Sequence, residues 1–424
     1  MKRMTITELN VLRQVKHADQ QIIESVTEII DTVRSGGDTA LRRYNSRFDQ
    51  FSDEKFWLTA KQIAAIAKNV STELEEAIDQ AYANISNFHQ PQKLQDYSVE
   101  TIPGLICNYK YLPIERVGLY IPGGSAPLFS SLLMSAIPAQ IAGNPVKVVC
   151  MPANKSGSID PATAYALQKC EIDRLYLVGG AQAIAAMAYG TKSVPQVDKI
   201  FGPGNIYVTT AKQLLRERGQ VEIDLAAGPS EVLIIADGSA DADIVAEDLL
   251  AQLEHGPDSL ALLISSSEQL INQVDSRIKY RIKNHPRAAI LHNSSSQLYA
   301  LKSSTQKAVT ISNDFGPEHL LLNCKDAEEL IPFIRNAGSV FVGSLSAEAL
   351  GDYASGPNHT LPTMGFARMA SGLSVGDFMK SISFQKVSEK GLNKLGPLVI
   401  QMAEAEQLPS HAESIRLRLK SEEK

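Results

Sequence analysis

The sequence has few cysteines and no long apolar run, and both absences narrow the class of protein. Its four cysteines, Cys107, Cys150, Cys170 and Cys324, lie far apart and form no CxxC pair. We therefore expect buried free thiols, and neither a disulfide framework nor a thiolate metal site. No apolar run approaches the roughly 20 residues that cross a bilayer, and the opening residues MKRMTITELN lack the apolar stretch of a secretory signal. We expect a cytoplasmic protein without a membrane partner.

An excess of basic charge is also missing. The sequence has 41 Lys and Arg against 47 Asp and Glu, which gives a net charge of −6, and the basic residues are scattered. A protein that binds nucleic acid or anionic lipid needs a concentrated positive field. We therefore expect no nucleic acid partner.

What is present is an ordinary globular composition, 44% hydrophobic and 21% charged, in a chain of 424 residues. This length exceeds what one hydrophobic core usually supports, so two or more units are expected. The first ninety residues have helical patterns. Five apolar residues fall on one helical face, namely Ile22, Val26, Ile29, Ile30 and Val33. Gly36 and Gly37 are expected to end that helix.

From about residue 115 the pattern changes to short β-rich runs, each followed by a glycine turn and a helix-like segment. The expected strands are 116–121, 146–150, 174–178 and 197–201 in a first series, and 231–236, 260–265, 319–322 and 339–342 in a second. This alternation predicts parallel βαβ units, and therefore two Rossmann-like units. Beyond about residue 385 a helical tail is expected, with Ser410 and Glu413 as the capping box of a last helix.

Three glycine-rich turns follow expected strands: PGGSAP at 122–127, GGAQAI at 179–184 and GPGN at 202–205. The last resembles the start of a dinucleotide fingerprint but lacks its third glycine. Each turn alone can be a simple tight connection. Three in one sheet favour a cofactor crevice, where helix N-termini and bare backbone amides face a pyrophosphate.

Several polar residues have the spacing of a metal site. Gln252 and His255 are three apart near the end of a helix expected at 241–255, so they share a face, and Asp352 and His359 bracket the turn YASGPN. Oxygen and nitrogen donors of this kind suit Zn²⁺ or Mn²⁺. The alternative is that His255 only caps its helix.

Two further groups carry titratable side chains. Glu318 and His319, in FGPEHLLL, form a candidate pair of general bases at the start of a strand, or else an edge-strand Glu beside a satisfied His. His411 is expected at the first position of the last helix, just after its cap, where the helix dipole favours a neutral ring that can donate a lone pair. On position alone, His411 is equally well a solvent-facing residue.

Together these motifs resemble histidinol dehydrogenase, over roughly residues 10 to 419. The segments that carry the resemblance are VGLYIPGGSAPL, VGGAQAIAA, DKIFGPGN, IDLAAGPSEVLIIAD, DLLAQLEHGPDS, NDFGPEHL and GDYASGPNHTLPT. Leu253 stands where the family usually has alanine, which can alter packing behind the donors without removing one.

The resemblance implies a role for each candidate residue. The implied zinc ligands are Gln252, His255, Asp352 and His411, and the implied catalytic residues are Glu318 and His319. Substrate would be held by Ser230, Gln252, His255, His319, Asp352, His359, Glu406 and His411. NAD would contact Tyr120, Gln182 and Asn205. Only Ser230 and Glu406 were not already suggested by the residues themselves.

The implied reaction is the oxidation of L-histidinol to L-histidine, through bound L-histidinal, with two NAD and one Zn²⁺ per subunit. His319 would take the hydroxyl proton, and Glu318 would activate water for the second oxidation. Two alternatives remain open at this point. One is a dehydrogenase of the same fold that acts on another small polar alcohol, and the other is a metal-dependent hydrolase.

The expected fold is therefore α/β, with two Rossmann-like units of an incomplete dinucleotide-binding type, a helical N-terminal region and a C-terminal helical arm. The expected division is an N-terminal segment 1–18, a first α/β domain 19–115 with 230–373 for metal and substrate, a second Rossmann-like domain 116–229 for NAD, and an arm 374–424. The resemblance implies a homodimer in which this arm is exchanged between subunits.

Overall fold

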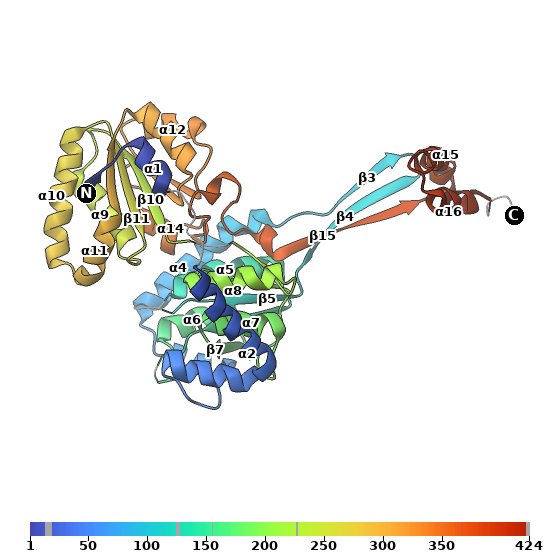
Figure 1. The fold of residues 1–424 in the computed structure, drawn as a ribbon, viewed down its shortest axis with the longest axis horizontal. Helices are drawn as coiled ribbons and strands as arrows, with labels where there is room; N and C mark the ends of the chain where they lie inside the picture. Colours follow the sequence, from blue (N-terminus) through green and yellow to red (C-terminus); the bar gives the residue numbers. More distant parts are fainter. Residues whose placement is uncertain (13–18, 124–127, 155, 226–227, 421–424) are drawn as a thin grey trace.

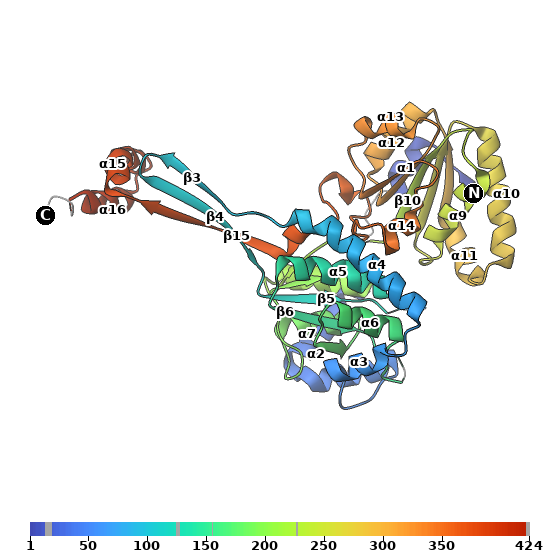
Figure 2. The same cartoon turned by 180° about the vertical axis from the view of Figure 1, so that it is seen from behind.

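The computed structural model describes residues 1–12, 19–123, 128–154, 156–225 and 228–420. Figures 1 and 2 show three parts: two bodies, each built on a six-stranded sheet, and a long arm built on a three-stranded sheet. The bodies lie side by side and the arm extends away from both of them. The N-terminus lies on the first body, and the C-terminus lies at the tip of the arm.

The first body has an entirely parallel sheet. Its strands, in spatial order, are β1 (Lys2–Arg3), β12 (Leu298–Lys302), β11 (Leu260–Ser265), β10 (Glu231–Ala236), β13 (His319–Asn323) and β14 (Ser339–Val342). Its helices are α1 (Ile6–Leu12), α9 (Ala242–Leu253), α10 (Glu268–Asn284), α11 (Ala288–Ser294), α12 (Thr305–Phe315), α13 (Ala327–Leu330) and α14 (Glu348–Tyr353).

Both faces of this sheet are buried, which explains why β10 is apolar along its whole length. Val232 and Ile234 pack into a core with α9, α10 and α11, whereas Leu233 and Ile235 pack into a second core with α1, α12 and α13. Successive side chains of a strand point to opposite faces, so a strand covered on both sides needs a continuous apolar run.

The second body has the strand order β2 (Trp57–Thr59), β7 (Arg174–Leu177), β6 (Val146–Met151), β5 (Arg116–Tyr120), β8 (Lys199–Phe201) and β9 (Glu222–Ile223). All neighbours are parallel except β2 and β7. One layer of helices contains α2 (Gln20–Tyr44), α7 (Gly180–Tyr189) and α8 (Ile206–Glu217). The other contains α3 (Ala60–Ala67), α4 (Thr72–His89), α5 (Phe129–Ala142) and α6 (Pro161–Lys169).

The assignment of residues 19–115 to the first domain is wrong for its helical part. The core around the second sheet includes Val26 of α2, Ile63 of α3 and Ile85 of α4, and β2 joins this sheet by pairing with β7. The reason is that a parallel sheet needs apolar helices on both faces, and these N-terminal helices supply part of that cover.

The arm also differs from the expected helical segment. It is an antiparallel sheet of β3 (Tyr97–Ile102), β4 (Leu105–Pro113) and β15 (Met379–Val387), followed by α15 (Glu389–Ala405) and α16 (Pro409–Lys420) at its tip. Residues 97–113 therefore belong to the arm and not to the first domain. The sequence concealed this because β15 pairs with β4, a strand from a distant part of the chain.

Local expectations were confirmed with small shifts. All eight expected strands form, and the tail beyond residue 388 is helical. α2 continues through Gly37 but is kinked there, at φ 50° and ψ −133°. The expected capping box of Ser410 and Glu413 was wrong: α16 begins at Pro409, because proline suits the first helical position, so Ser410 lies inside the helix. All four cysteines are free thiols, but only Cys150 and Cys170 are buried as expected, whereas Cys107 and Cys324 are half-buried. No helix among the described residues is long and apolar enough to span a bilayer.

Candidate active site

The candidate catalytic residues lie at the edge of the first sheet where β10, β11 and β13 begin. His319 is the first residue of β13, and Glu318 precedes it. The neighbouring strand β10 starts at Glu231, whose backbone N–H donates a hydrogen bond of 2.8 Å to Oε2 of Glu318. Parallel strands begin at one edge, so loops that are distant in sequence meet here.

A metal-binding arrangement lies at this edge. One ligand atom each of His255, Glu348 and Asp352 lie within 4.8 Å of one another. Glu348 and Asp352 are one turn apart on α14, so their carboxylates share a face of that helix, and His255 follows the end of α9. Imidazole and carboxylate donors suit Zn²⁺. Two of the four predicted ligands are therefore close together.

Gln252 is fully buried, yet its amide group is unpaired. Neither Oε1 nor Nε2 has a hydrogen-bond partner among the described residues. Burying an amide in this state costs roughly 1–3 kcal/mol. An unpaired oxygen in the last turn of α9, just before His255, fits a group that gains a partner when a cation or substrate binds. The donor set of this edge thus fits a zinc ion.

Glu318 and His319 adjoin this arrangement. Nδ1 of His319 is 3.4 Å from Oε1 of Glu348 and 3.8 Å from Oε2 of Glu318. Burial lowers the pKa of His319 to about 4, which keeps the ring neutral, and burial raises the pKa of Glu318 well above its usual value. A neutral imidazole can accept a proton from a hydroxyl group.

Two predicted substrate residues lie near this edge. Ser230 is half-buried and immediately precedes β10. Nδ1 of His359 lies 2.9 Å from the carbonyl oxygen of Asp352. A carbonyl only accepts, so Nδ1 carries the hydrogen and Nε2 has a free lone pair. Burial lowers the pKa of His359, and the carboxylate of Asp352 opposes that shift.

Glu406 and His411 are not part of this assembly within one chain. Glu406 follows α15 and His411 lies in the first turn of α16, and both side chains are exposed. Both helices are at the tip of the arm, far from the first body (Figures 1 and 2). Neither residue can therefore reach the candidate site of its own chain, and their predicted roles require a site elsewhere.

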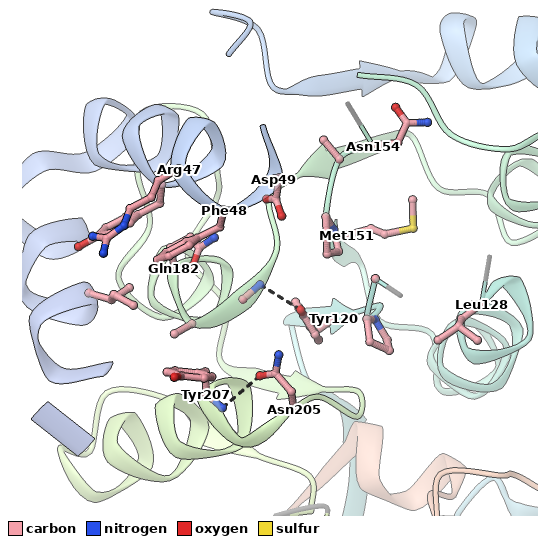
Figure 3. Close-up of a pocket in the computed structure, with 18 of the residues that line it drawn as sticks. Arg47, Phe48, Asp49, Tyr120, Leu128, Met151, Asn154, Gln182, Asn205 and Tyr207 are labelled. Atoms are coloured by element: carbon pink, nitrogen blue, oxygen red, sulfur yellow. Dashed lines mark hydrogen bonds between the residues drawn. The ribbon is translucent and has the colours of Figure 1, made fainter. Parts of the chain in front are cut away.

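The second body has a cavity of about 980 Å³ at the edge where its parallel strands end. Figure 3 shows residues from several of these loops around it, and the three predicted cofactor residues, Tyr120, Gln182 and Asn205, all line it. Pro122 and Gly123 line it too, whereas residues 124–127 of the first glycine turn lie outside the described residues. The three glycine turns thus converge on one cavity.

Backbone contacts hold these turns together. The backbone N–H of Gly180 donates to the Tyr120 hydroxyl at 3.0 Å, and Asn205 Oδ1 accepts from the N–H of Tyr207 at 3.1 Å, which caps α8 (Figure 3). Gly202 has φ 116°, and a Cβ there would lie 2.0 Å from the carbonyl oxygen of Tyr120. The N-termini of α7 and α8 thus open onto the cavity, where backbone N–H groups suit phosphate.

Two buried acids were missed by the sequence analysis. Glu348 precedes Asp352 at the spacing of one helical turn, which was the available signal. Glu231 accepts a hydrogen bond of 3.1 Å from the N–H of Met364, and burial raises its pKa to about 8. Its position inside the apolar run of β10 gave no sign of this contact, because the partner loop is remote in sequence.

Known proteins match nearly the whole chain. A family model described as histidinol dehydrogenase matches residues 12–419. Histidinol dehydrogenase from Vibrio parahaemolyticus is 47% identical over 400 residues, which are 94% of this chain and 92% of the relative. The enzyme of that name from Vibrio cholerae is 46% identical over 405 residues, 95% of this chain and 93% of the relative.

A solved structure agrees equally well. The crystal structure of histidinol dehydrogenase from Elizabethkingia anophelis has a TM-score of 0.93 and 42% sequence identity, and the match covers 100% of this chain and 98% of that chain. The match therefore includes both bodies and the arm. The resemblance inferred from the motifs is confirmed, and the chain belongs to the histidinol dehydrogenase family.

Proposed function

We propose that this chain oxidises L-histidinol to L-histidine, through L-histidinal that stays bound, with two NAD and one Zn²⁺ per subunit. The proposal rests on family membership and, above all, on one observation: a donor cluster of His255, Glu348 and Asp352 lies directly beside Glu318 and His319. A metal-binding group and an acid–base pair thus share one edge of the first sheet.

Zinc would be held by Gln252, His255, Asp352 and His411. The unpaired amide of Gln252 supports this choice, and Glu348 is close enough to serve as a further ligand or to orient His319. Zn²⁺, when bound, supplies a fixed positive charge that orients the polar substrate. Ser230, His359 and Glu406 would complete the substrate site.

His319 would take the proton of the substrate hydroxyl group, which its neutral ring allows. Glu318 would then activate a water molecule for addition to the aldehyde, and His319 would act a second time. The raised pKa of Glu318 makes it a stronger base once it is ionised, and the N–H of Glu231 helps to hold it in place. NAD, when bound, supplies the hydride acceptor for both oxidations.

NAD would bind in the cavity of the second body, in contact with Tyr120, Gln182 and Asn205. The convergence of the glycine turns and of two helix N-termini supports this location. The functional division is then a first body for metal and substrate and a second body for cofactor.

The functional unit would be a homodimer in which each arm completes the site of the other subunit. The support is that Glu406 and His411 are exposed at the tip of an arm that extends away from both bodies of its own chain. Apolar side chains of the arm, including Phe384, Leu398 and Met402, are also exposed and need a surface to cover them.

The proposal is tested by following NADH formation from limiting histidinol, together with the zinc content of the protein. We expect two NADH per histidinol, no accumulation of free aldehyde, loss of activity on prolonged chelation and recovery with added Zn²⁺. His255→Ala should lose zinc, whereas the exposed His292→Ala on α11 is the control and should keep it. Full activity in metal-free protein, or one NADH per substrate, would contradict the proposal.

A further inference from the structure

One acidic residue of the cofactor cavity has no role so far. Asp49 ends the short π-helical segment Asn45–Asp49 that follows α2, and its side chain lines the cavity. Figure 3 shows its carboxyl group on the same side of the cavity as Gln182 and directed toward Tyr120. Burial raises the pKa of Tyr120, and the nearby carboxylate of Asp49 adds to this shift.

The carboxyl group of Asp49 is poorly satisfied. Its Oδ2 atom is buried and has no hydrogen-bond partner among the described residues. Burial raises the pKa of Asp49 to about 6. A buried acceptor without a donor is unfavourable, and it persists at sites where a ligand supplies the donor. Within a dinucleotide, such donors are the ribose hydroxyl groups and two amide or amino groups.

The chain around Asp49 is anchored to the loops that follow β6 and β7. The side-chain amide of Asn45 donates to the carbonyl oxygen of Leu177, at the end of β7, with a distance of 2.8 Å. Phe51 packs against Gly157 in the loop after β6, so closely that a Cβ on Gly157 would lie 2.5 Å from its ring. Asp49 therefore lies on the β6 and β7 side of the cavity.

The β6 and β7 side of the cavity is the side that faces away from Glu318 and His319. β8 and β9 lie beyond β5 in the sheet, and the chain leaves β9 to enter the first body, where Gly228 donates to Thr363. The nicotinamide must approach Glu318 and His319, so it belongs on the β8 side. The adenosine half then lies over the loops of β6 and β7, as it does in dinucleotide-binding sheets generally.

In a Rossmann unit, an acidic residue at the end of the second strand binds the adenosine ribose. The equivalent strand here is β6, and the residues Pro152, Ala153 and Asn154 that follow it include no acid. Asp49 occupies that region of the cavity from a different segment of the chain. Asp49 thus takes the spatial position of the Rossmann acid, although it lies at a different place in the sequence.

We propose that Asp49 accepts hydrogen bonds from the 2′- and 3′-hydroxyl groups of the adenosine ribose and thereby selects NAD over NADP. This inference rests on the proposed use of the cavity by NAD. A 2′-phosphate would remove one donor and place negative charge beside the carboxylate. Among the described residues that line the cavity, Glu28 and Asp160 are further acids and Arg47 is the single basic residue, so this charge disfavours a further anion.

The test is direct binding of NADH and NADPH, measured by nucleotide fluorescence on the whole protein without substrate. Wild-type protein should prefer NADH. Asp49→Asn should weaken NADH binding about 10- to 100-fold, the loss expected for hydrogen bonds to a charged group, with a smaller change for NADPH. Asp53→Asn, an exposed acid four residues further on, is the matched control and should change neither.

A second experiment compares binding of AMP and 2′-deoxy-AMP, which differ only in the 2′-hydroxyl group that is the proposed donor. Wild-type protein should favour AMP, and Asp49→Asn should bind both equally. An unchanged NADH to NADPH ratio in Asp49→Asn overturns the role of Asp49 while leaving NAD use intact. Wild-type protein that binds neither dinucleotide contradicts the proposed function as well. A folding defect is detected by the thermal midpoint, which should not fall because the variant loses only an unpaired buried charge.

Discussion

In the first body the functional side chains lie where the strands begin, whereas in the second body the cavity lies where the strands end. The two edges also differ in their chemistry. The first carries buried atoms that have no partner in the described part of the chain, namely both amide atoms of Gln252, Nδ1 of His319 and Oε2 of Glu348. The second presents the glycine turns and the N-termini of α7 and α8.

This contrast separates reaction from binding. Groups that must take a proton or bind a metal need free lone pairs, and folding leaves them unpaired at a cost in stability. A cofactor that binds and leaves needs a rigid, preformed backbone surface. Asp49 is the exception in the second body, since it combines a backbone cradle with an unpaired acid.

The largest effect should come from the acid–base pair. His319→Gln should lower kcat about 10²- to 10⁴-fold for oxidation of both histidinol and histidinal, because a positioned base is lost. Glu318→Gln should slow mainly the step that needs water. NADH binding should be unchanged in both variants, which stopped-flow kinetics and a binding titration will measure. Equal loss of both oxidations in Glu318→Gln would contradict the division of roles.

The arm gives the next largest effect. If His411 serves the partner subunit, the inactive variants His255→Ala and His411→Ala should complement each other when subunits exchange. Each mixed dimer then has one intact site, and random 1:1 mixing should restore about a quarter of all sites. Mass spectrometry of differently tagged chains establishes that exchange has occurred. No activity in proven mixed dimers would show that His411 serves its own chain.

The cofactor edge should be sensitive to backbone shape. Gly202→Ala places a Cβ 2.0 Å from the Tyr120 carbonyl oxygen at a φ of 116°. We expect NADH affinity to fall about 10-fold and the free energy of unfolding to fall by about 1–3 kcal/mol. Gly238→Ala is the control, because its Cβ would meet nothing closer than 3.7 Å. Normal NADH affinity in Gly202→Ala would show that this turn does not shape the cavity.

A smaller effect of opposite sign is expected at the catalytic edge. Gln252→Met replaces an unpaired buried amide by an apolar chain of similar size, so metal-free protein should gain about 1 kcal/mol in unfolding free energy while losing zinc. The exposed Gln269→Met on α10 is the control. Chemical denaturation of metal-free protein measures both. A destabilised Gln252→Met would mean that the amide is satisfied in solution.

Local pattern was enough to predict much of this molecule, and long-range pairing was not. The eight expected strands and the candidate residues followed from periodicity, glycine turns and motif resemblance. The arm was missed because β4 and β15 pair across distant parts of the chain. Asp49 was missed for the same reason: its neighbours in space, such as Tyr120, belong to other elements. Sequence spacing carries no information about such contacts.

The smallest expected effect is the pH dependence of NADH binding through Asp49. Among the described residues that line the cavity, the other charged and titratable groups are Arg47 of the same segment, Glu28 and Tyr44 of α2, Tyr120 of β5, Asp160 before α6 and Tyr207 of α8. Burial raises the pKa of Asp49 to about 6. Ribose hydroxyl groups donate to the ionised carboxylate, so affinity should be nearly full above about pH 7 and fall about twofold at pH 6, where half of the carboxylate is protonated.

Stability should change with the opposite sign. The folded-state pKa lies above 3.8, the ordinary value for an aspartate, so the folded protein holds the proton more tightly than the unfolded chain. This contribution to stability is fully present below about pH 4 and is lost as the pH rises through about 6. Asp49→Asn should therefore show neither the affinity change nor the stability change over this range. NADH titrations and thermal midpoints between pH 5 and 8, with Asp53→Asn as control, measure both. An affinity change that persists in Asp49→Asn must come from another group and would remove Asp49 from the ribose site.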